Sequence, residues 1–347
     1  MENFDEYIRQ GEPNQAEKAK VWKTAIGLQQ VDGLTPSVYL IDTARQNIEG
    51  DITIKEVKQR LDSYYKQHPS KSAEDRTEEA DKVSARIAEI LSEQSFTFSP
   101  AEYLSIHRRL FHGIYKFAGK IRDYNITKQE WILDGETILY GSAESLKSTL
   151  EYDFEQEKKF SYKGLSQQET IEHIVHFISY LWQIHVFGEG NTRTTAIFLI
   201  KYLRTFGFKV NNELFEQHSW YFRNALVRAN YRNITKNIQA NNEFLLRFFG
   251  NLLLGENHVL TNREIHVHFD DTIKVQNDTI NDTINDTINN AVLDLIKQNN
   301  YINVSEISER LNISESTAKR KIKELKDQNI IERIGSNKTG CWKIIKK

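Results

Sequence analysis

Proline is nearly missing from this sequence. The chain has 347 residues and only 4 prolines, and none follows Pro100, whereas average usage of about 5% would give roughly 17. Because proline breaks helices and the central strands of sheets, a chain so poor in it can form long uninterrupted elements. Apolar residues recur at spacings of three and four in several segments, so we expect a mainly α-helical fold.

Breaks in the helical pattern divide the chain into four regions. Residues 1–70 are expected to be a helical N-terminal region, and residues 82–255 form the largest helical block. Within that block, Asp134-Gly135 separates two short apolar runs, a pattern typical of a β-hairpin. Residues 256–290 are interpreted as a linker that repeats Asn-Asp-Thr-Ile three times, and residues 291–347 as a winged helix-turn-helix.

The sequence also indicates the cellular compartment of the protein. No stretch approaches the roughly 18 uncharged apolar residues of a transmembrane helix, so we expect no membrane partner. The first residues are acidic and lack the apolar core of a secretory signal. The single cysteine, Cys341, has no partner for an internal disulfide. We therefore expect a cytoplasmic protein.

The charge is distributed unevenly along the chain. Residues 290–347 carry 12 Lys and Arg against 7 Asp and Glu, a net charge of +5, whereas the whole chain has −2. The third helix of the predicted winged helix-turn-helix carries Lys319, Arg320 and Lys323, which we expect to contact DNA phosphates and the major groove. The alternative is a protein-interaction module, a role that winged helices also serve.

Residues 185–193 carry the strongest chemical signal. A glycine-containing loop joins an amphipathic helix to a very apolar one, so free N–H groups at the start of the second helix form an anion site. Arg193 opposes the helix dipole there and is better explained by a bound phosphate. Glu189 beside a phosphate indicates a divalent cation, and His185 is a candidate base. By spacing alone, His185 would be a core histidine. The whole pattern favours phosphoryl or nucleotidyl transfer.

The same residues resemble the motif of the Fic (Fic/Doc, or Fido) family, which reads His-Pro-Phe-x-(Asp/Glu)-Gly-Asn-Gly-Arg-x-x-Arg. The matching positions are His185, Phe187, Glu189, Gly190, Asn191 and Arg193. Upstream, residues 110–122 look like the family's helix and its Ala-Gly-x-x-Arg turn. The resemblance covers roughly residues 95–255 and implies a Fic-type helical core with a β-hairpin flap.

The resemblance also implies an activity, namely protein adenylyltransfer. AMP would pass from ATP, with Mg²⁺, to a Ser, Thr or Tyr hydroxyl of a target protein. His185 would be the general base and Glu189 the Mg²⁺ ligand. The implied nucleotide-binding residues are Gly188, Gly190, Asn191, Thr192, Arg193 and Asn230, and the implied target-binding flap consists of Leu139, Tyr140 and Gly141. The alternative for Asn230 is an ordinary helix C-cap.

Three positions depart from the family motif. Val186 replaces proline. Thr192 replaces a glycine, so the loop must keep a negative φ there or be slightly reshaped. Ala196 replaces the second arginine, which in the family contacts the γ-phosphate. Weakened activity, an altered nucleotide preference and a different donor all remain open.

Residues 45–50 are similar to the family's inhibitory helix motif, (Ser/Thr)-x-x-x-Glu-(Gly/Asn). Glu49-Gly50 matches its end, whereas Arg45 stands at its first position. We therefore predict that Glu49 is autoinhibitory. The alternative is that Glu49-Gly50 is only a helix C-terminus with its glycine cap.

Two other functions are kept open. The departures and the basic C-terminal region are also compatible with a degenerate Fic scaffold that acts as a DNA-binding regulator. If Glu49 positions a water molecule, the chain would instead remove AMP from a modified protein. The sequence leaves a homodimer open, and His173 and His176 lack the matching ligand spacing of a zinc site.

Overall fold

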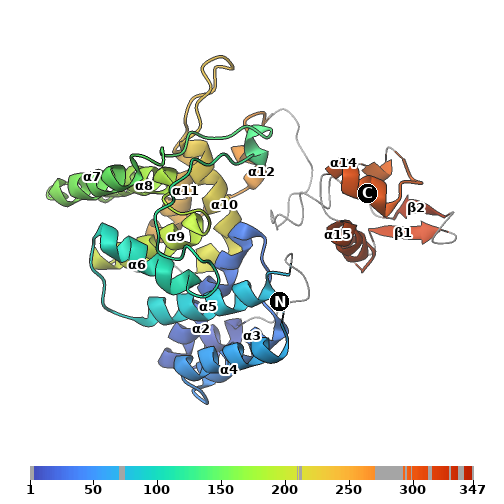
Figure 1. Cartoon of the computed structure of the whole chain (residues 1–347), viewed down its shortest axis with the longest axis horizontal. Helices are drawn as coiled ribbons and strands as arrows, with labels where there is room; N and C mark the ends of the chain where they lie inside the picture. The colour runs from blue at the N-terminus through green and yellow to red at the C-terminus, as the bar shows by residue number, and fades with distance from the viewer. Residues whose placement is uncertain are drawn as a thin grey trace. The chain divides into compact units, whose positions relative to one another are not determined.

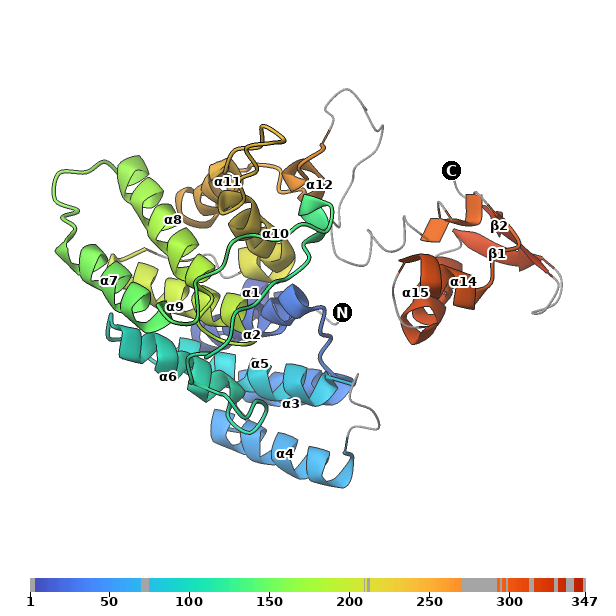
Figure 2. The ribbon, with the colours of Figure 1, turned by 45° about the horizontal axis from the view of Figure 1, so that its top comes forward.

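The computed structural model describes residues 4–69, 75–208, 210, 213–269, 292–293, 295–297, 299–311, 315–327, 330–334 and 340–345. The chain separates into two compact units, Met1–Phe269 and Asp270–Lys347, drawn in Figures 1 and 2. Each unit is described by itself. Of the predicted linker, residues 256–269 belong to the first unit and residues 270–290 lie outside the described residues.

The first unit consists of helices, which confirms the expected fold class. In chain order the helices are α1 (Asp5–Gln10), α2 (Pro13–Gly27), the 3-10 helix η1 (Leu28–Asp32), α3 (Val38–Glu49), α4 (Ile54–Gln67), α5 (Thr77–Ser92), α6 (Pro100–Phe111), the 3-10 helix η2 (Trp131–Leu133), α7 (Leu146–Lys159), α8 (Gln167–Ile184), α9 (Asn191–Thr205), α10 (Glu213–Ala229), α11 (Glu243–Phe249), the π-helix η3 (Gly250–Leu254) and α12 (Asn262–Ile265). None of these described helices combines the length and the apolar character that a membrane crossing requires.

Local sequence explains where the helices of the site begin. Ser166 caps α8, and Glu169 three residues later completes a capping box. Ser99 caps α6, with Pro100 at the first helical position. Both helices therefore start where the chain offers an oxygen to otherwise unpaired N–H groups, and this fixes the register of the apolar faces that follow.

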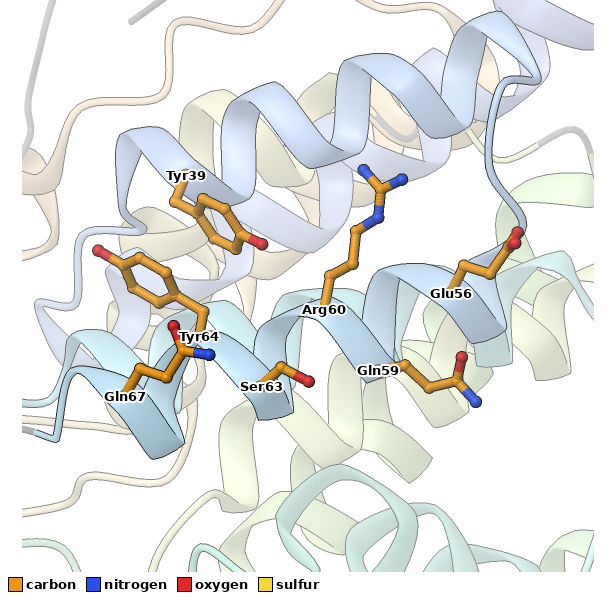
Figure 3. A pocket seen from close by; sticks show the side chains of 7 residues that line it. All are labelled: Tyr39, Glu56, Gln59, Arg60, Ser63, Tyr64 and Gln67. Atoms are coloured by element: carbon orange, nitrogen blue, oxygen red, sulfur yellow. The ribbon is translucent and has the colours of Figure 1, made fainter.

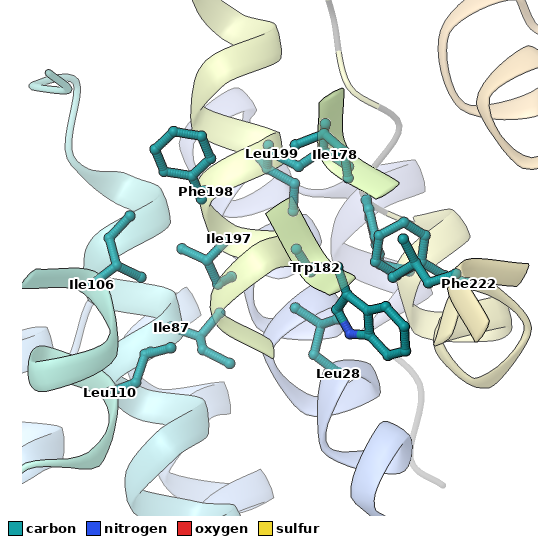
Figure 4. Close-up of a cluster of buried hydrophobic side chains, with 14 of the residues drawn as sticks. Leu28, Ile87, Ile106, Leu110, Ile178, Trp182, Ile197, Phe198, Leu199 and Phe222 are labelled. Atoms are coloured by element: carbon teal, nitrogen blue, oxygen red, sulfur yellow. The ribbon is translucent and has the colours of Figure 1, made fainter. Parts of the chain in front are cut away.

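Helix α9 lies at the centre of the first unit. It contacts α5, α6, α8 and η1, and every residue from 191 to 203 is buried. Figure 4 shows Ile197, Phe198 and Leu199 of this helix among apolar side chains of its neighbours. Burial on all sides fits the apolar run 196–200 in the middle of the helix, whereas the polar residues of its first turns are buried as well. Any group at the α9 N-terminus is therefore held by a rigid interior.

The predicted β-hairpin around Asp134 is wrong in its strands and right in its turn. Asp134 and Gly135 both adopt left-handed φ angles, of 54° and 81°, but no paired strands flank them. The preceding residues form η2, and Ile132 is fully buried, with its carbonyl accepting a hydrogen bond from the Val267 N–H at 3.0 Å. Packing against the core competes with strand pairing and prevails here.

The second unit has the predicted winged helix-turn-helix order. Helices α14 (Val304–Leu311) and α15 (Glu315–Asp327) precede strands β1 (Ile331–Ile334) and β2 (Cys341–Ile344), which pair antiparallel with Ile331 opposite Ile344. The described part of residues 292–297 is also helical. Its small core consists of Val292, Ile296, Ile302, Ile307, Ala318, Ile322, Leu325, Ile331 and Trp342.

Candidate functional site

His185 ends α8 in a left-handed backbone conformation, with φ 53° and ψ 55°. Its side chain is buried, and neither ring nitrogen has a hydrogen-bond partner. The ring lies against Tyr140, with 4.4 Å between ring centroids, and against Trp182 at 5.3 Å. Burial lowers the pKa of the imidazole well below 6.5, and the charge of Lys128 lowers it further. The ring is therefore neutral at pH 7 and able to accept a proton.

Two glycines shape the loop that follows His185. Gly190 has φ 78° and caps α9, and a Cβ atom there would collide with the ring of Phe111. A Cβ atom on Gly188 would collide with the hydroxyl of Tyr124. Gly190 therefore requires glycine both for its backbone conformation and for the space beside Phe111, whereas at Gly188 the exposed Tyr124 side chain could move aside.

The first residues of α9 close the loop with their side chains. Asn191 accepts a hydrogen bond from the Phe187 N–H at 3.0 Å and donates one to the Phe187 carbonyl at 2.8 Å. Its amide, expected to line the anion site, instead holds the loop together. Thr192 lies in regular helix, so its φ is negative as its side chain requires, and its hydroxyl accepts a hydrogen bond from the Trp182 indole. Only the backbone N–H groups of this first turn face no intrahelical acceptor.

Glu189 is held from two directions. His107 of α6 donates from Nε2 to the Glu189 carbonyl at 3.0 Å, because its Nδ1 accepts from the Gly119 N–H at 2.8 Å. Burial lowers the pKa of His107 to about 4, so this tether is neutral. The Glu189 carboxylate pairs with the Lys128 ammonium at 3.3 Å, and both side chains are about one-third exposed. Neither His107 nor Lys128 was identified from the sequence as part of the site.

Arg193 does not face open space, contrary to its expected role at the donor phosphates. Its fully buried guanidinium pairs with Glu79 of α5 and Asp32 of η1, each at 2.7 Å, and donates to the Gln29 side chain at 2.9 Å. The Asp32 contact is an ion pair without hydrogen-bond geometry. The guanidinium also lies over the Phe111 ring. Two carboxylates from N-terminal elements therefore neutralise the one arginine of the motif.

Glu49, the predicted inhibitory residue, lies on the surface of the first unit. It is the last residue of α3, is exposed, and accepts a hydrogen bond from the Tyr7 hydroxyl. Gly50 follows with φ 93° and caps the helix. The structure therefore matches the alternative reading, a helix C-terminus with its glycine cap. The acidic residues that reach the motif are Asp32 and Glu79, which no sequence pattern had indicated.

Arg122 connects the predicted flap to His185 through hydrogen bonds to backbone carbonyl groups. Arg122 donates from Nε to the His185 carbonyl at 2.8 Å and from a terminal nitrogen to the Gly141 carbonyl at 2.5 Å. Tyr140 is buried over the His185 ring and donates to Glu130 at 3.2 Å, whereas Leu139 is 84% exposed. Glu130 in turn pairs with Arg223 at 2.6 Å. Tyr140 thus covers the candidate base, and Leu139 is the flap residue that a partner can reach.

Asn230 and Ala196, two positions that the family resemblance singled out, lie among the helices of the first unit. The Asn230 amide follows the end of α10 and donates to the carbonyl and hydroxyl of Ser179 and to the Leu226 carbonyl. Ala196 is fully buried in α9. Hence Asn230 joins α10 to α8 in this structure, and the position of the family's second arginine holds an apolar side chain.

His173 and His176 have other partners in the structure. His173 pairs with Glu157 at 2.7 Å and stacks on Phe160, and His176 lies beside Asn242. Across the described residues, no group of three or more His, Cys, Asp or Glu side chains is arranged to hold a metal ion. A hollow between α3 and α4, shown in Figure 3, is lined by Tyr39, Glu56, Gln59, Arg60, Ser63, Tyr64 and Gln67 and includes none of the predicted site residues.

In the second unit, α15 buries one face and exposes basic residues on the other. Ala318, Ile322 and Leu325 are buried, whereas Lys319 and Lys323 are exposed. The side chain of Arg320 lies outside the described residues. The exposed lysines are therefore placed as a recognition helix would place phosphate contacts.

Comparisons with known proteins agree with both units. Residues 97–203 match the Fic/DOC family, and residues 285–332 match a family of winged helix-turn-helix DNA-binding domains. The protein adenylyltransferase VbhT of Bartonella schoenbuchensis is 26% identical over an alignment of 144 residues that covers 38% of this chain and 29% of that protein. The chain therefore spans less than a third of the length of this curated relative.

Solved structures of Fic proteins resemble the chain at low identity. The N-terminal Fic domain of an effector protein from Bartonella sp. AR 15-3 has 20% identity and a TM-score of 0.40, covering 56% of this chain and 82% of that one. A Fic family protein from Desulfovibrio desulfuricans G20 has 12% identity and a TM-score of 0.42, covering 99% of this chain and 92% of that one.

Proposed function

We infer that this chain, whose residues 97–203 are a Fic/DOC domain and whose residues 285–332 are a winged helix-turn-helix, transfers AMP from ATP to a hydroxyl group of a target protein. One observation carries the proposal. His185 is a buried, neutral imidazole with two unpartnered nitrogens, at the entrance to a loop that leads to the N-terminus of α9. A buried imidazole without a hydrogen bond is costly and is retained where it serves a reaction.

In this proposal His185 takes the proton of the target hydroxyl. The resulting oxygen forms a bond to the α-phosphorus as the bond to the leaving pyrophosphate breaks. The backbone N–H groups at the α9 N-terminus stabilise the charge that develops on the α-phosphate. Leu139, exposed on the flap, contacts the target, and Tyr140 must move from the His185 ring before the hydroxyl can reach it.

The residues present fit a nucleotide-bound Mg²⁺. This ion usually keeps several waters and takes one or two carboxylates together with substrate phosphates. Glu189 offers one partly exposed carboxylate next to the α9 N-terminus. When bound, the ion neutralises phosphate charge during transfer. Because no larger cluster of ligands surrounds Glu189 among the described residues, the nucleotide itself must complete the coordination.

We further propose that Asp32 and Glu79 hold the site in a restrained state. Both carboxylates occupy the guanidinium of Arg193, which therefore cannot meet the negative charge of a donor phosphate. This restraint replaces the one expected from Glu49. To test the restraint, Asp32 is a better residue to substitute than Glu79, because the Asp32 side chain is partly exposed. Without the Asp32 charge, Arg193 still has Glu79 and Gln29 as partners.

The test is transfer of label from α-³²P-ATP by the full-length chain with Mg²⁺, both to itself and to proteins of a cell extract. Asp32→Asn should raise the labelling by about tenfold, and Glu49→Gln should leave it unchanged. His185→Asn in the Asp32→Asn background should abolish labelling, because asparagine tolerates the left-handed backbone but cannot act as the base.

The outcomes separate the two parts of the proposal. Labelling that survives His185→Asn would exclude the proposed base. No labelling by any variant would leave a degenerate scaffold as the better interpretation. A rise with Glu49→Gln and none with Asp32→Asn would return the inhibitory role to Glu49. Release of AMP from labelled target by the Asp32→Asn variant would favour the reverse reaction.

We also propose that the second unit binds DNA through α15, an inference supported by the exposed Lys319 and Lys323. Affinity for a fluorescein-labelled duplex of mixed sequence should fall as salt rises. Lys323→Ala should reduce the slope of log affinity against log salt by about 1. Lys147→Ala, on an exposed face of α7, is the matched control. An unchanged slope for Lys323→Ala would contradict this contact.

A further inference from the structure

The site described above is short of positive charge for a nucleotide donor. Ala196 has no charge, and the guanidinium of Arg193 is buried against Asp32 and Glu79. ATP carries several negative charges on its phosphates, and an enzyme that moves a nucleotidyl group needs cations around them. Another side chain must therefore supply charge near the α9 N-terminus.

Lys128 stands at that place. Its backbone N–H donates to the hydroxyl of Thr137, two residues before the flap, at 3.3 Å. Its ammonium lies 3.3 Å from the Glu189 carboxylate, two residues before α9 begins. The side chain is about one-third exposed, so the charge is fixed at the loop and still accessible to a ligand.

The neighbouring arginines have other roles. Arg122 donates to the carbonyl groups of His185, Tyr124 and Gly141 and so binds backbone to backbone. Arg223 pairs with the buried carboxylate of Glu130 at 2.6 Å. Lys128, by contrast, pairs with Glu189, the carboxylate that would turn to the metal ion when the nucleotide binds. Of these three cations, Lys128 is the one whose carboxylate partner would be needed elsewhere, by the metal ion.

We propose that Lys128 binds the phosphate chain of the nucleotide donor and supplies charge that Ala196 cannot. This inference rests on the proposed function and deepens it by adding a donor-binding residue ahead of the flap in the chain. In the unliganded state the ammonium pairs with Glu189. If Glu189 were to hold a nucleotide-bound Mg²⁺, the Lys128 ammonium would lose this partner and could pair with the phosphate oxygens.

An ordinary surface ion pair is the competing explanation. A pair as exposed as Lys128 and Glu189 contributes about 0–1 kcal/mol to stability. If that were its whole role, removing the ammonium would leave nucleotide binding unchanged. The two explanations therefore differ in what they predict for ligands with and without phosphates.

The experiment is equilibrium dialysis of the full-length chain with radiolabelled ATP and Mg²⁺, and separately with radiolabelled adenosine. Lys128→Met keeps the length of the side chain and removes its charge, so it should weaken ATP binding by about 10- to 100-fold. Adenosine binding should change by less than about twofold. Lys128→Arg should restore part of the ATP affinity. Lys147→Met, far out on an exposed helix face, should match the wild type.

Each outcome bears on a different claim. Unchanged ATP affinity in Lys128→Met would overturn the inference, and so would equal losses for ATP and adenosine, because they indicate a structural role. A wild-type chain that binds ATP but transfers no AMP contradicts the proposed function and leaves the Lys128 contact standing. A wild-type chain that binds no ATP would overturn both.

Discussion

Asp32 and Glu49 share the same local setting. Each is the last residue of a helical element, and each precedes a glycine with a left-handed φ, 67° at Gly33 and 93° at Gly50. Their environments nevertheless differ. Asp32 reaches a fully buried arginine of the motif at 2.7 Å, whereas Glu49 lies on the surface beside Tyr7.

The difference lies in what each element packs against. The 3-10 helix η1 contacts α9 and α10, so its last residue points into the interior of the first unit. Helix α3 contacts α2 and α4, which keep its C-terminus outside. An acidic residue followed by glycine therefore indicates how a helix ends, and tertiary packing decides whether the acid reaches a site.

The largest expected effect on stability comes from removing Arg193, the cation that Asp32 contacts. Arg193→Gln removes the cation shared by the buried Glu79 and the partly exposed Asp32, and although Glu79 keeps Arg76, the change should lower the free energy of unfolding by about 3 kcal/mol. Urea unfolding of the full-length chain measures it. The control is Arg45→Gln on α3, whose half-exposed pair with Asp42 should matter by less than about 0.5 kcal/mol. Equal small losses would show that the buried pair is not formed in solution.

A second comparison uses the two glycines. Gly33→Ala and Gly50→Ala each place a Cβ atom in the left-handed region, so both should cost about 1 kcal/mol of unfolding free energy. Only Gly33→Ala should disturb Asp32, and it should therefore raise AMP labelling several-fold while Gly50→Ala does not. If both glycine variants raise labelling alike, loosening of the N-terminal region as a whole is the cause, and the Asp32 contact is not.

The pH dependence of the unfolding free energy tests the pairing of Glu79 with its arginine partners. Burial alone would raise the pKa of Glu79, but the hydrogen bond from Arg76 and the charge of Arg193 outweigh it and hold that pKa below 4.5. Glu79 therefore contributes stability above about pH 4.5, and this contribution is lost as the pH falls through its folded-state pKa. The difference in unfolding free energy between wild type and Glu79→Gln should be full at pH 7 and shrink below pH 4.5. A difference that stays constant down to pH 3 would contradict this pairing.

The smallest effect is expected at Glu49. Burial, followed by the hydrogen bond to Glu49, raises the pKa of the Tyr7 hydroxyl to about 12. Glu49→Gln should lower that pKa toward 10, which NMR of labelled tyrosine can follow, while unfolding free energy changes by less than about 0.5 kcal/mol. A loss above 2 kcal/mol would mean that Glu49 has buried partners after all.

Periodic patterns predicted the elements well. The three- and four-residue spacing of apolar residues along α8, the apolar run of α9 and the helix order of the second unit are confirmed, because burial of apolar faces determines them. The strands around Asp134 failed because a local turn signal cannot report that Ile132 packs into the core.

The site was predictable in part. Residues 185–193 follow one another in the chain, so their motif could be read directly. The partners of Arg193 come from elements more than 100 residues away, and only the folded chain brings them there. Lys128 belongs to a segment without regular structure and with no motif of its own, so its approach to Glu189 could not be predicted.

Asp32 and Arg193 belong to one polypeptide and one compact unit. Their encounter is intramolecular, so it occurs at an effective concentration that dilution cannot change. Activity per molecule should accordingly be the same at nanomolar and micromolar enzyme. Under the proposed restraint, a signal that frees Arg193 would act within the unit by moving η1 away from α9.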